Sequence, residues 1–276
     1  MNRILAKKYL SVNVVEIEVE SPLIARKRQA GHFVILKVGE RGERIPLTIA
    51  KADATRGTIT LIIQKVGLTS NKVASLEVGD EVTDVVGPLG HPTHIAKVGT
   101  LLCAGGGVGV APLLPIVEAM HLAGNRIITV LAARTKDLVI LEREIRSNSD
   151  EVIIMTDDGS YGQKGLVTQG MEAVISREKI DMALTIGPAI MMKYCSLLTA
   201  KYNIPTMASL NAIMVDGTGM CGACRVSVGG ATRFVCVDGP EFNAHEVDFD
   251  ELLMRLGGYS EEEKMVYHRY RDGSMK

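Results

Sequence analysis

Short runs of alternating apolar and polar residues fill the first 95 positions of the chain. An alternating stretch at 12–19 is followed by GHFVILKV at 31–38 and GTITLIIQKV at 57–66. Each run is rich in β-branched residues and bounded by turn residues, which is typical of strands in a small antiparallel barrel. We expect the segment from the Gly79-Asp80 turn to Gly90 to close that barrel.

Between residues 98 and 212, apolar runs typical of buried strands alternate with runs that have the spacing of helices. The predicted strands are 99–103, 126–133, 151–156 and 182–186, and the predicted helices are 111–122, 138–147 and 165–175. Strands that alternate with helices indicate a parallel sheet wound on both faces, and such sheets bind ligands beside the carboxyl ends of their strands. The loops at those ends are 105–109, 133–136, 157–161 and 187–191.

The last segment begins with glycines and cysteines and then becomes helical. Residues 242–256 mix an extended start with a short helix, and residues 259–270 carry an amphipathic pattern opened by a capping box of Ser260 and Glu263. We therefore predict a β plus α/β fold class. Its three domains are expected at 1–96, 97–212 and 213–276.

Composition and charge narrow the classes of function. The chain has 276 residues and a formal net charge of −1, so neither nucleic acid nor an anionic membrane is an expected partner. Residues 98–117 carry no charge, but their five glycines and two prolines fit strand, loop and helix start better than a membrane span. The N-terminus lacks the apolar core of a signal peptide. We expect a soluble, cytoplasmic protein.

Three of the five cysteines, Cys221, Cys224 and Cys236, lie in one short stretch, and Asp216 stands five residues before the first of them. The spacing D-x4-C-x2-C-x11-C matches a plant-type [2Fe–2S] site, C-x4-C-x2-C…C, with aspartate in the first position. Two irons bridged by two sulfides need four further ligands, which these residues supply. The intervening glycines let the backbone wrap closely around a cluster.

Other interpretations of the cysteine stretch stay open at this point. A structural zinc could take three thiolates and a carboxylate, although most structural sites use four cysteines or a cysteine/histidine mixture. A disulfide is disfavoured because nothing marks the chain as secreted. The cysteines could also merely pack in a glycine-rich turn. The remaining two, Cys103 and Cys195, are expected to be core residues.

Two predicted loops of the barrel could bind a phosphate. Residues 44–48 offer a cation, a rigid turn and a hydroxyl, and residues 67–72 offer two hydroxyls ahead of a predicted helix, whose N-terminus suits a pyrophosphate. The alternative is an arginine on a strand edge and a Ser/Thr helix cap. The loop 105–109 lets a diphosphate approach bare backbone, although it is not the G-x-G-x-x-G fingerprint.

The order of these motifs resembles the ferredoxin–NADP reductase superfamily: RIPLT, GLTS, GGGVGVAP, TDDGS and IGP-x-x-MM. The trailing DGTGMCGACR…CVDGPEF is similar to the small subunit of NADH-dependent ferredoxin:NADP oxidoreductases of the sulfide dehydrogenase type. The electron-transfer subunit of dihydroorotate dehydrogenase B is a close relative. That relative carries four cysteine ligands, so Asp216 favours the first group. The resemblance covers essentially the whole chain.

The resemblance implies three prosthetic groups or substrates and a set of residues for each. FAD would lie on the barrel, a nicotinamide nucleotide at the carboxyl edge of the parallel sheet, and a [2Fe–2S] cluster in the C-terminal domain. For FAD the residues are Arg44, Pro46, Leu47, Thr48, Gly67, Thr69 and Ser70; for the nucleotide they are Gly105, Gly106, Gly107, Val108, Gly109, Arg134, Asp157, Asp158, Gly159, Gly187, Pro188 and Met191; for the cluster they are Asp216, Cys221, Cys224 and Cys236.

The implied function is an oxidoreductase subunit that moves electrons between NAD(H), FAD and the cluster. No side-chain acid, base or nucleophile is expected, because hydride transfer requires only position and electrostatics. Relatives place a second nucleotide and [4Fe–4S] clusters in a larger partner subunit, and ferredoxin would interact only indirectly. The alternatives are the dihydroorotate dehydrogenase B subunit and, from another class, a zinc-stabilised adaptor without catalysis.

The choice between NAD(H) and NADP(H) depends on the loop after the second predicted strand of the parallel sheet. Arg134 and Lys136 could clamp a 2′-phosphate, whereas Asp137 could accept a hydrogen bond from a free 2′-hydroxyl. A solvated loop of mixed charge is the alternative. The resemblance favours NAD(H), because the small subunit of that family handles NAD(H).

Overall fold

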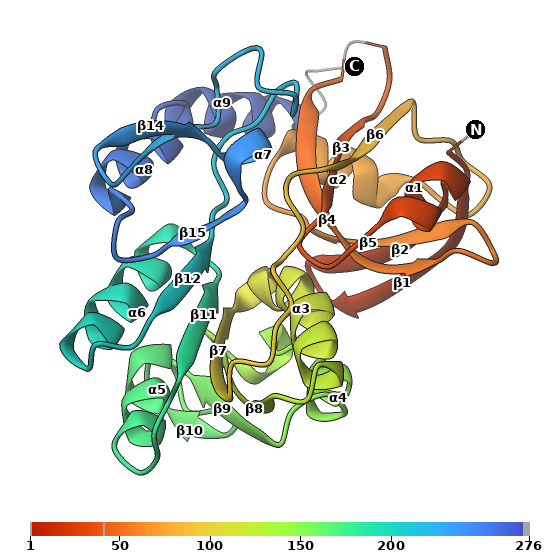
Figure 1. Cartoon of the computed structure of the whole chain (residues 1–276). Helices are drawn as coiled ribbons and strands as arrows, with labels where there is room; N and C mark the ends of the chain where they lie inside the picture. Colours follow the sequence, from red (N-terminus) through yellow and green to blue (C-terminus); the bar gives the residue numbers. More distant parts are fainter. Residues whose placement is uncertain (1, 41, 273–276) are drawn as a thin grey trace.

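Three groups of elements follow one another along the chain (Figure 1). The structure is a computed structural model, and it describes residues 2–40 and 42–272. The first two groups are sheets, one antiparallel and one parallel, and the third is a small αβ unit that contacts both.

The first group is an antiparallel barrel. Its strands are β1 (Ile4–Ser11), β2 (Val14–Glu20), β3 (Phe33–Lys37), β4 (Arg44–Asp53), β5 (Thr58–Gln64) and β6 (Asp84–Leu89), in the order β1-β2-β5-β4-β3-β6. Helix α1 (Pro22–Lys27) connects β2 to β3, and α2 (Leu68–Ser75) connects β5 to β6. The Ile4 N–H donates to the Asp80 carbonyl over 2.9 Å, which brings the first strand against the segment before the last.

The second group is a parallel sheet covered by helices on both faces. Its strands are β7 (Thr100–Gly106), β8 (Arg126–Ala133), β9 (Glu151–Thr156), β10 (Gln163–Lys164), β11 (Met182–Ile186) and β12 (Thr206–Ser209). Helices α3 (Val110–Leu122) and α4 (Glu142–Arg146) pack on one face, and α5 (Val167–Ile175) and α6 (Ala189–Lys201) pack on the other. Leu101 and Leu102 point to opposite faces and are both buried, as expected of a strand covered twice.

The order of strands in this sheet is β10-β9-β8-β7-β11-β12-β15. Chain order reverses between β7 and β11, which pair in parallel from Leu101 opposite Met182 to Gly105 opposite Ile186. A reversal of this kind opens a crevice at the carboxyl ends of the two strands, where ligands of such sheets bind.

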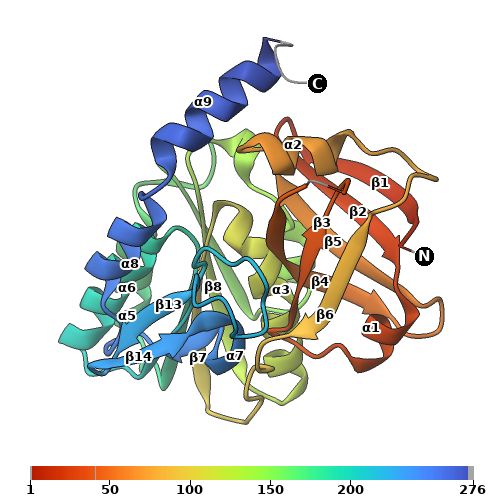
Figure 2. The same cartoon turned by 90° about the horizontal axis from the view of Figure 1, so that it is seen from above.

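The third group joins both sheets. It consists of β13 (Arg225–Val228), β14 (Ala231–Phe234), α7 (Val235–Asp238), β15 (Glu241–Asn243), α8 (Phe249–Leu256) and α9 (Ser260–Arg271). Strand β15 pairs antiparallel with β12, and the core of this group includes Phe33 of the barrel and Met192 of α6. Figure 2 shows α9 at the edge of the molecule, where it contacts α2, and none of its residues is buried.

The expected fold class is confirmed, and several elements match their predicted bounds. The predicted strands 126–133, 151–156 and 182–186 coincide with β8, β9 and β11. Cys103 and Cys195 are fully buried, as predicted. Among the described residues no helix has both the length and the apolar character needed to cross a bilayer.

Some local predictions were wrong. Residues 44–48 are the first half of β4 rather than a loop, because each pairs with a residue of β3. Residues 189–191 begin α6 rather than extending the loop after β11, and the predicted helix 138–147 shrinks to α4, which begins at Glu142 after a left-handed Leu141 with φ of 56°. The capping box at Ser260 does not form, since the residue before α9 is Tyr259 and has no side-chain cap.

Candidate functional site

Bare backbone closes the crevice between β7 and β11. Residues 107–109 form a short 3-10 turn that leads directly into α3. A Cβ on Gly109 would lie 2.6 Å from the Ile186 carbonyl oxygen and 2.7 Å from Gly187 Cα, so the two loops touch through main chain alone. The structure therefore brings the predicted residues 105–109 and 187–188 together at the carboxyl edge of the sheet.

The loops after β8 and β9 form the neighbouring rim of this edge. The Lys136 N–H donates to Ser160 Oγ over 2.8 Å, and the Lys136 ammonium lies 5.6 Å from the centre of the Tyr161 ring. Ser160 donates from both its hydroxyl and its N–H to Asp158, and these bonds lower the pKa of that carboxyl. Arg134 is exposed at the same rim. The two loops thus form one connected surface of mixed charge.

On the barrel, Pro46 and Thr48 share one face of β4. Pro46 lies opposite Ile35, and Thr48 lies opposite Phe33. Since cross-strand partners point to the same side of a sheet, these four side chains face the third group, whose core includes Phe33 and Ile35. Leu47 points the other way and packs against the barrel core. Only part of the predicted set 44–48 therefore faces the crevice side of the barrel.

Helix α2 begins one residue after Gly67, and its hydroxyls have internal partners. The Ser70 hydroxyl accepts hydrogen bonds from the N–H groups of Val66 and Gly67, at 3.0 Å and 2.9 Å. The Thr69 hydroxyl donates to the carboxylate of Glu43 over 2.7 Å. The first N–H groups of the helix stay free for a phosphate, as at any helix N-terminus. Glu43 precedes RIPLT and was not singled out from the sequence.

The four predicted cluster ligands form two pairs. Asp216 accepts hydrogen bonds from the N–H groups of Thr218 and Cys221, each over 2.9 Å, and these bonds hold the pKa of its carboxyl low. The sulfurs of Cys224 and Cys236 lie 3.2 Å apart. Burial, reinforced by the Cys224 sulfur, raises the pKa of Cys236 to about 12.

These donors fit an iron–sulfur cluster. In the part of the chain that the structure describes, no three His, Cys, Asp or Glu side chains converge on one point that could hold a metal ion. One carboxylate–thiol pair and one thiol–thiol pair would suit two irons that each take one pair. Glycines with positive φ at 217, 219 and 222 turn the backbone around them.

The cluster loop rests directly on the barrel face described above. A Cβ on Gly217 would lie 2.7 Å from side-chain carbons of both Ile35 and Leu89. Ile35 is in turn the cross-strand neighbour of Pro46. The candidate flavin face and the candidate cluster loop are therefore adjacent, which is the arrangement that electron transfer between two such groups requires.

The chain is similar to several known proteins. Residues 211–248 match the family described as the iron–sulfur cluster binding domain of dihydroorotate dehydrogenase B. A Thermotoga maritima protein described as a homologue of the dihydroorotate dehydrogenase B (NAD(+)) electron transfer subunit is 47% identical over 270 residues, covering 98% of this chain and 95% of that protein. The Desulforamulus reducens electron transfer subunit is 30% identical and covers 89% of this chain and 96% of its own.

The chain belongs to the family of dihydroorotate dehydrogenase B electron transfer subunits and their homologues. One solved structure, of an NADH-dependent reduced ferredoxin-NADP oxidoreductase studied for flavin-based electron bifurcation, is 46% identical, with a TM-score of 0.93 and 98% of each chain covered. The resemblance drawn from the motifs is confirmed.

A half-buried acid at the meeting point of the three groups was also missed. The Thr93 hydroxyl donates to Glu241 over 2.5 Å, and a Cβ on Gly31 would lie 3.2 Å from the same carboxylate. Burial raises the pKa of Glu241. The motif CVDGPEF contained this glutamate, but nothing in the spacing indicated that the linker residue Thr93 would cover it.

Proposed function

We propose that this chain is an electron-transfer subunit that carries FAD and a [2Fe–2S] cluster and exchanges electrons with NAD(H), within a ferredoxin:NADP oxidoreductase complex. The observation that supports it best is the contact between Gly217 of the cluster loop and Ile35, the neighbour of Pro46 on the barrel face. The 46% identity to a chain of the NADH-dependent ferredoxin-NADP oxidoreductase supports the same complex.

Different parts of the chain would bind the flavin and the nicotinamide nucleotide. Thr48 and Pro46 would border the flavin, and the free N–H groups at the start of α2 would hold its pyrophosphate. Bare backbone at 105–109 and 187 would bring a nicotinamide nucleotide close to that flavin. FAD, when bound, supplies the conversion between two-electron hydride transfer and one-electron transfer. The chain needs no acid or base for this exchange, only the fixed approach of the groups that it binds.

Asp216, Cys221, Cys224 and Cys236 would hold the cluster, as two pairs of ligands. A carboxylate is a harder ligand than a thiolate, so Asp216 sets this site apart from the four-cysteine sites of dihydroorotate dehydrogenase subunits. A partner subunit with its own flavin and [4Fe–4S] clusters would complete the complex, with ferredoxin reached through it. The thiol-rich site suits a reducing compartment, the cytoplasm.

The second candidate is the electron-transfer subunit of dihydroorotate dehydrogenase B, supported by the match of residues 211–248 and by the descriptions of two relatives. Identification of the partner that co-purifies separates the two. A flavin TIM-barrel dehydrogenase would support the second candidate, and a larger subunit with [4Fe–4S] clusters supports the first.

Cofactor analysis tests the proposal directly. Anaerobically purified protein should contain one FAD, two irons and two sulfides per chain, because the site offers four ligands in two pairs. Asp216→Cys should keep a cluster with altered EPR g-values, and Asp216→Ala should make the cluster labile. Zinc in place of iron would support the adaptor alternative, and an unchanged EPR signal in Asp216→Ala would remove Asp216 from the ligand set.

Nucleotide preference follows from the rim of the crevice. Lys136 is held over Tyr161 and Asp158 is held by Ser160, so a 2′-phosphate would find Arg134 but also a fixed carboxylate. NADH should therefore reduce the flavin with a specificity constant at least about tenfold above that of NADPH, about 1.4 kcal/mol. Stopped-flow bleaching of the flavin with each nucleotide measures the ratio, and equal rates would contradict it.

A further inference from the structure

The side chain of Met191 lies over the two glycines that line the crevice. A Cβ on Gly106 would overlap the sulfur of Met191, and one on Gly187 would lie 2.7 Å from its methyl carbon. The hollow that these glycines leave at the carboxyl edge is thus filled by a thioether of the same chain. No other described side chain comes so close to both glycines.

Met191 differs from its neighbour in how firmly it is held. It sits in the first turn of α6 and is only half-buried, whereas Met192 is fully buried in the core of the third group. A methionine side chain has three rotatable bonds and no branch, so it can leave one hollow and repack in another at small cost. Met192 anchors the turn, whereas Met191 only borders the core of the third group and the core on the α5–α6 face of the sheet.

The hollow lies where the proposed function needs space. Gly106 ends β7 and Gly187 follows β11, on either side of the point at which strand order reverses. A nicotinamide ring that reaches the flavin from this edge must lie against the same bare backbone. The ring and the Met191 thioether cannot both occupy it.

We propose that Met191 is a displaceable cover over the nicotinamide end of the nucleotide site. This inference rests on the proposed function for the identity of the ligand, and on the contacts of Gly106 and Gly187 for the cover. The thioether fills the hollow in the free protein and rotates out when the nicotinamide enters. The cost of that rotation lowers the affinity for the dinucleotide, but not for a ligand that lacks nicotinamide.

ADP-ribose provides that second ligand, because it keeps both phosphates and the adenosine but has no nicotinamide. Isothermal titration of the FAD- and cluster-loaded protein should be run with NAD⁺ and with ADP-ribose. In Met191→Ala the Kd for NAD⁺ should fall about threefold to tenfold, the ratio expected when one side-chain rearrangement is removed. The Kd for ADP-ribose should stay within about twofold of the unsubstituted protein.

Met254→Ala is the matched control, since Met254 is 70% exposed on α8 and the change of side chain is the same. It should leave both dissociation constants unchanged. An unchanged or weakened affinity for NAD⁺ in Met191→Ala, or an equal gain for ADP-ribose, would overturn the cover. Failure of the unsubstituted protein to bind either ligand would instead overturn the nucleotide site itself, and with it the proposed function. Thermal melting of each variant confirms that it is folded.

Discussion

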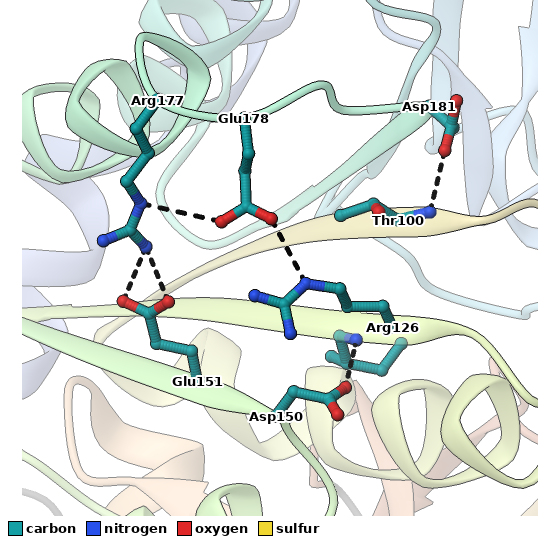
Figure 3. A network of polar contacts seen from close by, with 8 residues as sticks. Thr100, Arg126, Asp150, Glu151, Arg177, Glu178 and Asp181 are labelled. Atoms are coloured by element: carbon teal, nitrogen blue, oxygen red, sulfur yellow. Dashed lines mark hydrogen bonds and ion pairs between the residues drawn. The ribbon is translucent and has the colours of Figure 1, made fainter.

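At the amino edge of the parallel sheet, charged side chains tie the strands together, whereas at the carboxyl edge the strands end in bare glycine backbone. Arg177 binds both oxygens of Glu151 at 2.6 Å, and Arg126 binds Glu178 over 3.2 Å. Figure 3 shows this network together with two carboxylates that accept main-chain N–H groups, Asp150 from Ile127 and Asp181 from Thr100.

The carboxyl edge has the opposite construction. Gly106, Gly109 and Gly187 bring main chain against main chain, with Met191 as the side chain over them. On this side the half-buried Glu241 has a hydroxyl as its partner and a raised pKa, while Asp181 at the amino edge has a lowered pKa because Lys179 and the Thr100 N–H bind it. Side-chain bonds join the segments at the amino edge, whereas main-chain contacts and Met191 close the carboxyl edge.

The two edges are separated by the length of a strand, roughly 20 Å for six residues. Substitutions at such distances act independently in most proteins. Variants at the amino edge should therefore change stability alone, and variants at the carboxyl edge should change stability and nucleotide affinity together.

The largest loss of stability is expected for a substitution of Asn125, at the amino edge of the sheet. This side chain is 5% exposed, and its oxygen accepts N–H groups from Val98 and Gly99 while its nitrogen donates to the carbonyls of Ala96 and Met120. Asn125→Ala leaves several buried groups unpaired and should lower the free energy of unfolding by about 4 kcal/mol, or the melting temperature by roughly 10 °C.

NAD⁺ affinity should stay within about twofold in the folded Asn125→Ala protein. Asn148→Ala is the control, because that side chain makes one bond, to the Glu144 carbonyl, and is less buried; it should cost about 1 kcal/mol. Weaker NAD⁺ binding with an unchanged melting temperature would contradict the separation of the two edges.

A smaller loss of stability, coupled to a loss of binding, is expected at the carboxyl edge. Gly109→Ala places a methyl group 2.6 Å from the Ile186 carbonyl oxygen, and because both neighbours are main chain the loops must separate. We expect about 2 kcal/mol of destabilisation and a rise of at least about tenfold in the Kd for NAD⁺. Titration and thermal melting measure the two effects.

Gly257→Ala is the control for Gly109→Ala, since a Cβ there would lie at ordinary distances of 3.6 Å from its neighbours. It should change neither quantity. Loss of stability in Gly109→Ala with normal NAD⁺ affinity would show that contact between the loops is not part of the nucleotide site.

The parallel sheet was predictable from the sequence because its strands are continuous apolar runs bounded by turn residues. Strands β8, β9 and β11 match the predicted bounds for this reason. The start of β4 could not be predicted from the sequence, because a proline such as Pro46 is typical of a turn. The structure explains how a proline fits there: residues 44–48 pair only with β3, while β5 pairs with residues 49–53, so the missing N–H costs no ladder bond on the open side.

The parts of the candidate site that depend on the spacing of residues along the chain could be predicted from the sequence. The parts that depend on contacts between distant segments could not. The spacing of Asp216, Cys221, Cys224 and Cys236 predicted a ligand set, and the structure brings these residues together as two pairs. Nothing in the motif IGP-x-x-MM indicated which methionine would cover Gly106. Asn125 sits in a segment that reads as an ordinary turn, and its four hydrogen bonds depend on where the segment before β7 passes.

The smallest change in stability is expected for a substitution of Glu241. Its pKa is raised, whereas the pKa of Asp181 at the amino edge is lowered, so the two acids should affect stability in opposite directions as the pH rises. Burial raises the folded-state pKa of Glu241 above its unfolded value, so this group stabilises the fold at low pH and loses that contribution as pH rises through the folded pKa. Glu241→Gln stays neutral, can still bond Thr93, and should raise the melting temperature at pH 8 by roughly 2 °C, about 1 kcal/mol. The gain should shrink at pH 5.5, because the two side chains then differ less in charge.

Glu262→Gln, on the exposed α9, is the control and should show no gain in melting temperature at either pH. A Glu241→Gln gain that is equal at both pH values, or a loss at pH 8, would mean that the carboxylate is stabilised by its surroundings, as the acids of the amino edge are.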